Sequence, residues 1–168
     1  FTTLRDVDLS GVTLSPLKQQ AIANLQLGNN VKLQIQVAKG PWKKDGYTGS
    51  TLTEAPFDGS WDGSTYQTAG DHLNTEILIV VPGGAEGAGL ASKYNLTQVQ
   101  GPAPAPLVND ALAQYEPLLP GVTAAWNAGP KLAWVNDGNL EPRQQGAWVH
   151  YNVGQYTGFG GAEGLAEG

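Results

Sequence analysis

The chain has 168 residues, enough for one domain with a hydrophobic core. Its net charge of -6, without a clustered basic surface, argues against nucleic-acid binding. It contains no cysteine, which excludes disulfides, thiolate zinc sites and thiol nucleophiles, and its 23 glycines and 11 prolines are typical of a loop-rich sheet protein rather than a helical bundle.

The first expected element is a helix that begins after Ser15, a suitable N-cap, with Pro16 at the first helical position. Gly28 is the expected end of this helix. Residues 31–37 ("VKLQIQV") then alternate between apolar and polar side chains, which predicts a strand that is buried on one face.

The middle of the chain carries turn signals around a second strong strand. Two Asp-Gly pairs within residues 57–68 indicate a short strand or hairpin. The apolar run at 76–81 ("EILIVV") predicts a strand buried on both faces. Residues 83–106 are rich in glycine and proline, and we expect a linker or a compact loop over the sheet. Because no amphipathic helix is expected after "GGAEGAG" at 83–89, its glycine spacing does not predict nucleotide binding.

The last third of the chain predicts one more helix and two more strands. A helical stripe of apolar residues covers 107–115, and prolines follow it. Strands are expected within 130–136 ("PKLAWVN") and 146–153 ("GAWVHYNV"). This order predicts an α+β fold, a mixed or antiparallel sheet with helices packed on one face, forming a single domain over 1–168 with one core.

No complete catalytic motif is visible by spacing alone. His72 and His150 have no partnering motif, so no metal site is predicted. Lys32 lies on the polar face of its strand, where it is either a solvated lysine or faces a cofactor or substrate. Residues 152–161 ("NVGQYTGFGG") combine aromatic side chains with glycines that permit close backbone approach, so this segment is either a plain turn or a cradle for a flat ligand.

Four segments, in this order along the chain, carry a resemblance to a known family. They are "LRDVDLSGVTLSPLKQQAIANLQLGNNVKLQIQV", "PWKKDGYTGST", "YEPLLPGVTAAWN" and "HYNVGQYTGFGGAEG". The chain resembles the C-terminal half of flavin-containing amine oxidases, the family of monoamine oxidase, putrescine oxidase and L-amino acid oxidases. The resemblance implies a substrate-binding domain without the dinucleotide-binding half. Because the chain starts at Phe1 and ends before the family's next flavin-contacting segment, we expect a fragment of a longer flavoenzyme.

The resemblance also implies roles for individual residues. Lys32 matches the lysine that bonds through a water to the flavin N5, and Tyr156 matches one wall of the aromatic cage that orients the amine. Gln155 takes the place of the cysteine that links FAD covalently in animal monoamine oxidases, so any FAD is expected to be non-covalent. Trp148 and Tyr151 are expected to line the substrate site.

The implied reaction is FAD-dependent oxidation of an amine or amino acid to an imine, with oxygen giving hydrogen peroxide. We expect the isolated chain to be inactive and to need the FAD-binding portion or a partner chain, although a homo-oligomer is an alternative assembly. A non-catalytic ligand-binding or interaction module derived from the oxidase is the alternative function. Carboxylate recognition, which would separate amino-acid from amine substrates, is not assigned to either arginine, Arg5 or Arg143.

Overall fold

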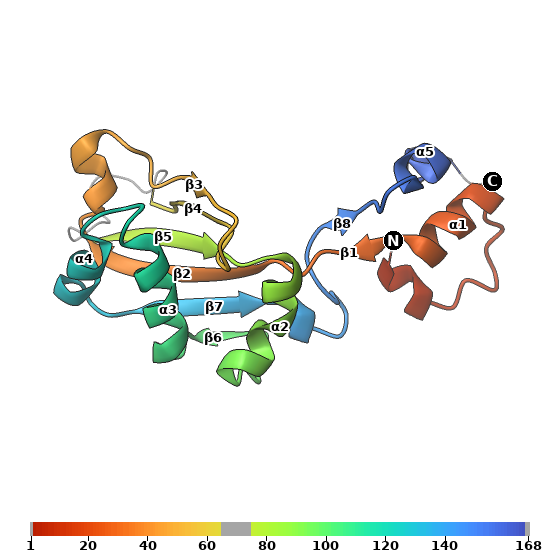
Figure 1. Cartoon of the computed structure of the whole chain (residues 1–168). Helices are drawn as coiled ribbons and strands as arrows, with labels where there is room; N and C mark the ends of the chain where they lie inside the picture. The colour runs from red at the N-terminus through yellow and green to blue at the C-terminus, as the bar shows by residue number, and fades with distance from the viewer. Residues whose placement is uncertain (1, 65–74, 167–168) are drawn as a thin grey trace.

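The computed structural model describes residues 2–64 and 75–166, which form two groups of elements joined by a narrow two-stranded ribbon (Figure 1). The sheet part comprises the described residues of 29–147. The terminal part comprises residues 2–25 and 151–166, and the ribbon consists of β1 and β8. The helices are α1 (Pro16–Asn24), α2 (Gly84–Tyr94), α3 (Ala105–Tyr115), α4 (Val122–Ala128) and α5 (Gln155–Phe159). The strands are β1 (Gln26–Leu27), β2 (Val31–Ala38), β3 (Thr51–Leu52), β4 (Gly59–Asp62), β5 (Thr75–Val81), β6 (Gln100–Pro102), β7 (Ala133–Asp137) and β8 (Val149–His150).

The sheet part contains one six-stranded sheet in the order β3-β4-β5-β2-β7-β6. All five pairings are antiparallel, which confirms the predicted α+β class and selects the antiparallel form of the sheet. The β2 strand lies at the centre, where Gln34 is opposite Ile79 of β5 on one side and opposite Trp134 of β7 on the other.

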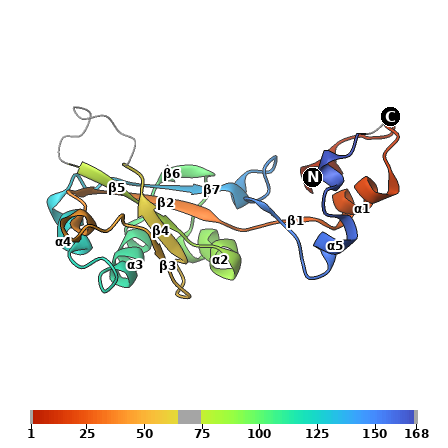
Figure 2. The same cartoon turned by 90° about the horizontal axis from the view of Figure 1, so that it is seen from above.

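The two faces of the sheet differ because side chains alternate along each strand. The apolar residues of β2 lie on a covered face: Val31, Leu33, Ile35 and Val37. These side chains pack in the main core with buried residues of α2, α3 and α4, and Figure 2 shows the three helices on the same side of the sheet. The prediction of helices on one face is therefore confirmed, and Lys32 and Gln34 lie on the other, open face.

The first helix starts as the sequence predicts and ends earlier. The Ser15 side chain accepts a hydrogen bond from the Lys18 backbone N–H, and Pro16 is the first residue of α1. The prediction that the helix ends at Gly28 is wrong, since α1 ends at Asn24. Pairing explains the difference: β1 takes up residues 26–27, and the Gly28 N–H donates to the Trp148 carbonyl.

The glycine-rich segment after β5 is a helix, so the prediction of a linker or loop there is wrong. The α2 helix buries Gly87, Leu90 and Tyr94, and β6 follows it. Each interior glycine costs about 1 kcal/mol of helix propensity relative to alanine, and tertiary packing outweighs this cost. Gly87 is required for the packing, because a Cβ there would lie 1.7 Å from the Asn29 carbonyl oxygen.

Other predicted elements are confirmed in part. Helix α3 and strand β7 fall where they were expected, whereas α4 was not predicted as a separate helix. The expected strand over 146–153 is shortened to β8, and α5 lies within the predicted glycine-rich turn. In β5, Leu78 and Val80 are fully buried and Ile79 is half-buried, so burial on both faces is incomplete. The segment 57–68 supplies β4, and its end lies outside the described residues, as does His72.

The buried apolar side chains form two clusters, where the sequence predicted one core. The main cluster fills the space between the sheet and its helices. A smaller cluster lies between α1 and the α5 region and contains Ala21, Leu25, Phe159 and Ala162. None of the helices in residues 2–64 and 75–166 is long and apolar enough to cross a membrane.

Candidate functional site

The open face of the sheet presents Lys32 near the start of β2. Its side chain is exposed, and Asn136 of β7 lies directly opposite it in the antiparallel register. Gln34, two residues further along β2, is on the same face because side chains alternate. Lys32 therefore lies on the open, polar face of its strand, as the alternation in the sequence predicts.

A pocket of about 390 Å³ opens around this lysine. Four of its lining residues carry side-chain amides, one carries an ammonium group and one carries an indole. The lining consists of Asn30, Lys32, Gln34, Asn136, Gly138, Gln144, Ala147 and Trp148. Since none of these eight residues is acidic, the ammonium group of Lys32 meets no carboxylate among them.

Trp148 reaches this pocket because the ribbon brings residue 148 back beside the start of β2. The Gly28 N–H donates to the Trp148 carbonyl at 2.7 Å, and the Ala147 N–H donates to the Gly28 carbonyl at 2.7 Å. Gly146 permits this close approach, with φ of +143° and a position where a Cβ would lie 2.8 Å from the Gly28 oxygen. The Trp148 side chain is 61% exposed, so its ring is accessible to a ligand.

The loop on the other side of the pocket is fixed by a buried carboxylate. One oxygen of Asp137 accepts from the Asn139 backbone N–H at 3.0 Å and from its side-chain amide at 2.7 Å. The Gln144 amide donates to the Gly146 carbonyl at 2.9 Å. A Cβ on Gly138 would lie 2.5 Å from the Gly146 carbonyl oxygen, so glycine is needed where the loop closes on itself.

Sequence reasoning did not identify Asn136, Asp137 or Gln144. Asn136 has the same parity as Trp134 in the predicted strand, so strand alternation places these two side chains on one face of the sheet. Its pairing with Lys32 depends on the register between β2 and β7, which no local signal supplies.

Tyr151 and Tyr156, two of the three aromatic residues predicted for the site, lie outside the pocket of Lys32. Tyr156 belongs to α5, where its ring is 73% exposed and makes an edge-to-face contact with Tyr151 at 5.3 Å between centroids. Gln155 donates to the Asn24 carbonyl at 3.2 Å. Helix α5, which contains Gln155 and Tyr156, lies beyond the ribbon from β2 (Figure 1), and Tyr151 directly follows β8. The structure therefore brings Lys32 together with Trp148 and not with Tyr156, Gln155 or Tyr151.

Tyr151 is also perturbed in its acid–base behaviour. Desolvation and the nearby Glu163 carboxylate raise the pKa of its phenol above the ordinary value. The hydroxyl donates to Glu163 at 3.2 Å, so Tyr151 is committed to contacts within the terminal part. The remaining candidates are surface groups: His150 is exposed in β8, and Arg143 is exposed in the loop before Gly146.

The residues around Lys32 fit the ring system of a flavin. An isoalloxazine ring is flat and carries hydrogen-bond acceptors along one edge, and the pocket offers an ammonium donor, amide donors and an indole surface. Diphosphate has no matching site at the glycine-rich start of α2, because the pocket there is lined by the carboxylates of Glu54, Asp58 and Glu86. The described residues also contain no group of three or more His, Cys, Asp or Glu side chains that could hold a metal ion.

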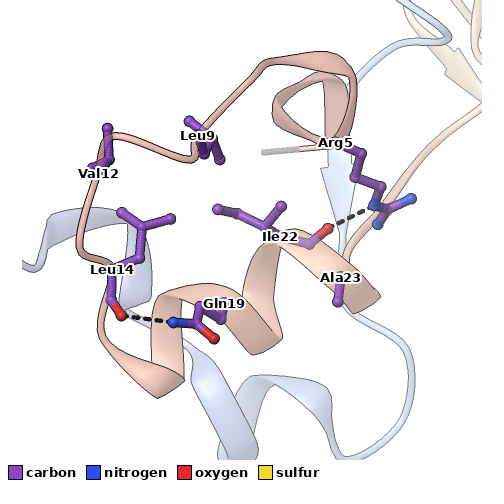
Figure 3. A pocket seen from close by; sticks show the side chains of 7 residues that line it. All are labelled: Arg5, Leu9, Val12, Leu14, Gln19, Ile22 and Ala23. Atoms are coloured by element: carbon purple, nitrogen blue, oxygen red, sulfur yellow. Dashed lines mark hydrogen bonds between the residues drawn. The ribbon is translucent and has the colours of Figure 1, made fainter.

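A second pocket, of about 540 Å³, lies in the terminal part between α1 and the segment before it (Figure 3). Its lining is mainly aliphatic, from Leu9, Val12, Leu14 and Ile22. Its polar members already bond to the backbone: Arg5 donates to the Ile22 carbonyl at 2.6 Å and Gln19 donates to the Leu14 carbonyl at 2.8 Å (Figure 3). This pocket therefore offers apolar surface and no evident chemistry.

Comparison with known proteins identifies the fold. No family model matches the chain, and no curated protein matches its sequence. Cyclohexylamine oxidase from Brevibacterium oxydans superposes with a TM-score of 0.62 and 19% identity, over 89% of this chain and 30% of that one. Wild-type putrescine oxidase bound to putrescine matches with a TM-score of 0.55 and 16% identity, over 85% of this chain and 28% of the other. A triple mutant from a redesign of cofactor binding in putrescine oxidase gives a TM-score of 0.57 at 14% identity.

The chain thus spans about 30% of the length of the oxidases that it matches. The identities are too low to transfer residue roles, and the shared property is the arrangement of the sheet and its helices. The resemblance predicted from the sequence is confirmed at the level of the fold: the chain folds as the matching part of cyclohexylamine oxidase and putrescine oxidase.

Proposed function

We propose that this chain forms the substrate-binding part of a flavin-dependent amine oxidase. The observation that carries the proposal is the shared pocket of Lys32 and Trp148 on the open face of a sheet whose fold is that of two amine oxidases. When bound, the flavin would supply the redox chemistry: two electrons and two protons pass from the amine C–N unit to FAD and on to oxygen, which becomes hydrogen peroxide, and water hydrolyses the imine.

In this proposal Lys32 donates a hydrogen bond, directly or through water, to the acceptor edge of the flavin. Its place on the open face, opposite the uncharged Asn136, supports the role, because no acidic residue of the pocket lining competes for its ammonium group. The chain has no cysteine, so it would not attach the flavin ring through a thioether.

Trp148, rather than Tyr156, is the aromatic wall in this proposal. Trp148 lines the pocket of Lys32, whereas Tyr156 lies in α5 beyond the ribbon. An indole and side-chain amides make a weakly polar surrounding without a carboxylate to stabilise an ammonium ion. Such a surrounding favours the neutral amine, the form that must react, by disfavouring the charged form through desolvation.

The remainder of the enzyme would come from a further segment or from a partner chain. Two observations support this: the chain spans about 30% of the oxidases it matches, and large apolar side chains around the ribbon and α5 are exposed. Examples are Trp148, Val149, Val153 and Tyr156. The same exposure favours the second candidate function, a non-catalytic interaction module, and also a homo-oligomer. Sedimentation of the purified chain over a concentration series distinguishes a monomer from a self-associating module.

The flavin proposal is tested on the chain itself with lumiflavin, which carries the isoalloxazine ring without the ribityl-ADP moiety. We expect lumiflavin to shift the amide signal of Lys32 and the indole signal of Trp148 in nitrogen-15 NMR spectra. Lys32→Met and Trp148→Ala should each weaken this binding, while Lys44→Met, at an exposed lysine of the helical turn 41–45, should not. Shifts confined to other residues, or none up to the solubility limit, would refute the flavin site.

A further inference from the structure

The charged side chains of the strands are divided between the two faces of the sheet. The acidic ones lie on the covered face, and Lys32 lies on the open face. Among the described residues, the acidic side chains of the six strands are Asp62, Glu76 and Asp137. Asp62 is opposite Leu78, Glu76 is opposite Val37, and Asp137 is opposite Val31, so all three lie on the covered face.

Each of these carboxylates accepts at least one hydrogen bond on that side of the sheet, and the second oxygen of Asp137 is buried. Asp62 accepts from the Trp42 indole at 3.2 Å, and Glu76 pairs with Lys43 at 2.8 Å. Asp137 accepts from Asn139. None of them is available to a ligand on the open face, where Lys32 is the single charged side chain among the described strand residues.

An apolar row crosses the open face beside the row that contains Lys32. Trp61 is opposite Ile79, Ile79 is opposite Gln34, Gln34 is opposite Trp134, and Trp134 is opposite Pro102. The row therefore runs across five strands. Because residues two apart along a strand are separated by about 7 Å, it lies about one small-molecule width from Lys32 and Asn136.

Side chains in this row are accessible. Trp134 is 44% exposed, and Trp61 and Ile79 are half-buried. Gln34, at the middle of the row, also lines the pocket of Lys32, so the row and the pocket are continuous.

We infer that the amine recognised here is a hydrophobic monoamine, rather than a diamine or an amino acid. The inference rests on the proposed function, in which Lys32 is engaged with the flavin. The apolar body of the substrate would lie along the row of Trp61, Ile79 and Trp134. A second ammonium group on this face would experience the field of Lys32, and no carboxylate of the described strand residues lies on this face to offset it.

A substrate carboxylate would also lack a cationic partner among the described strand residues once Lys32 is engaged. The chain has two arginines, and neither lies on the open face. Arg5 donates to the Ile22 carbonyl in the terminal part, and Arg143 is in the exposed loop before Gly146. The open face thus disfavours diamines and amino acids, because the second ammonium group of a diamine and the carboxylate of an amino acid would each be left without a partner of opposite charge.

Three probes with the same aromatic body test this selection on the purified chain in the presence of excess lumiflavin, which engages Lys32 as the inference assumes: benzylamine, its α-carboxylated counterpart phenylglycine, and the diamine para-xylylenediamine. We expect benzylamine to shift the indole signals of Trp61 and Trp134 in NMR spectra, with a dissociation constant about tenfold or more below those of the other two. Equal or tighter binding of the diamine or of phenylglycine overturns the inference. So does the absence of benzylamine shifts at these two indoles up to saturating probe.

A nearly isosteric substitution sharpens the test. Gln34→Glu places a carboxylate at the centre of the row without removing apolar surface, so it should raise the affinity for the doubly charged diamine by about tenfold relative to that for benzylamine. Gln98→Glu, at an exposed position outside the sheet, is the matched control and should leave all three constants unchanged. An unchanged order of preference in Gln34→Glu would overturn the role of the row.

The lumiflavin titration separates this inference from the proposed function. Lumiflavin binding at Lys32 and Trp148 without discrimination among the three probes refutes the substrate class alone. Selective benzylamine binding without lumiflavin binding refutes the oxidase role, and with it the premise that Lys32 is engaged by a flavin.

Discussion

The sheet part and the terminal part differ in the number of buried side chains that form their cores. Among the described residues, 18 buried side chains form the core of the sheet part, whereas 4 form that of the terminal part. The sheet part packs the apolar side chains of its covered face against its own helices, although apolar side chains elsewhere in it, such as Leu52 and Trp134, are exposed. The terminal part leaves Val153 and Tyr156 exposed, and Val149 in the adjoining ribbon is exposed as well. The difference indicates that the sheet part carries most of the stability, and it supports the proposal that a further segment or a partner chain covers the terminal part.

The largest effect is expected from a cavity in the sheet part. Leu33 is fully buried at the centre of β2, opposite Val80 and Val135. Leu33→Ala should lower the free energy of unfolding by about 2–5 kcal/mol, through lost burial and the cavity left behind. Denaturant titration measures this, with Leu52→Ala, at a side chain that is 90% exposed, as the near-neutral control. Equal effects of the two substitutions would contradict the assignment of the core.

A smaller and more local effect is expected in the terminal part. Phe159→Ala removes the largest member of its cluster and should cost about 3 kcal/mol there, since α1 has little other buried surface. Hydrogen exchange should show loss of protection in α1 and retained protection in β2. Leu165→Ala, at a more exposed position in the same part, should change neither. Equal loss of protection in β2 would mean that the two parts unfold together.

A matched pair of glycines in α2 separates packing from helix propensity. Gly87→Ala should destabilise the sheet part by about 1–3 kcal/mol, because its Cβ would meet the Asn29 backbone and force the helix away. A Cβ at Gly89 would meet nothing within 4 Å, so Gly89→Ala should stabilise the protein by about 0.5–1 kcal/mol. Thermal unfolding of both variants measures the difference, and the same sign in both would contradict the tight contact.

The smallest effect is expected only in acid. Burial is the largest influence on Asp62 and raises its pKa, but hydrogen bonds from Ser64, Trp42 and Lys43 together hold that pKa below the ordinary value of 3.8. The folded protein therefore binds this proton less tightly than the unfolded chain does. The resulting stability is present above the unfolded-state value and is lost as pH falls through the folded-state pKa.

Asp62→Asn provides the measurement. The wild-type protein should lose stability below about pH 4, and the variant should lose less over that interval because the titrating group is gone. Parallel pH profiles of unfolding for the two proteins would show that another carboxylate controls acid stability.

The parts of the fold that the sequence predicts are those with strong local signals. Alternation alone defines β2, and Ser15 followed by Pro16 defines the start of α1. Helix α2 was hidden because its glycines lower local helix propensity, while the decisive contact of Gly87 with Asn29 joins segments far apart in the chain. The end of α1 was misplaced for a similar reason, since β1 exists through its pairing with β8.

The residues of the candidate site also differ in whether local signals are enough to place them. Lys32 was identified from strand parity, which is local. Trp148 and Tyr156 stand eight residues apart in one aromatic, glycine-rich tail, and their sequence does not indicate which of them meets Lys32. The path of the ribbon decides it: hydrogen bonds between Gly28 and residues 147–148 hold Trp148 beside β2, and the chain then continues away to α5.

The ribbon has a consequence for how the chain can be divided. Because β1 leads into the sheet part and β8 leads out of it as an antiparallel neighbour, the sheet part is topologically an insertion in a loop of the terminal part. Leu27 and Val149 are already register partners, so a short reverse turn between them would join the two segments of the terminal part into one shorter, continuous chain. The two ends of the excised sheet part would lie side by side, which is the condition for exchanging such a segment between proteins.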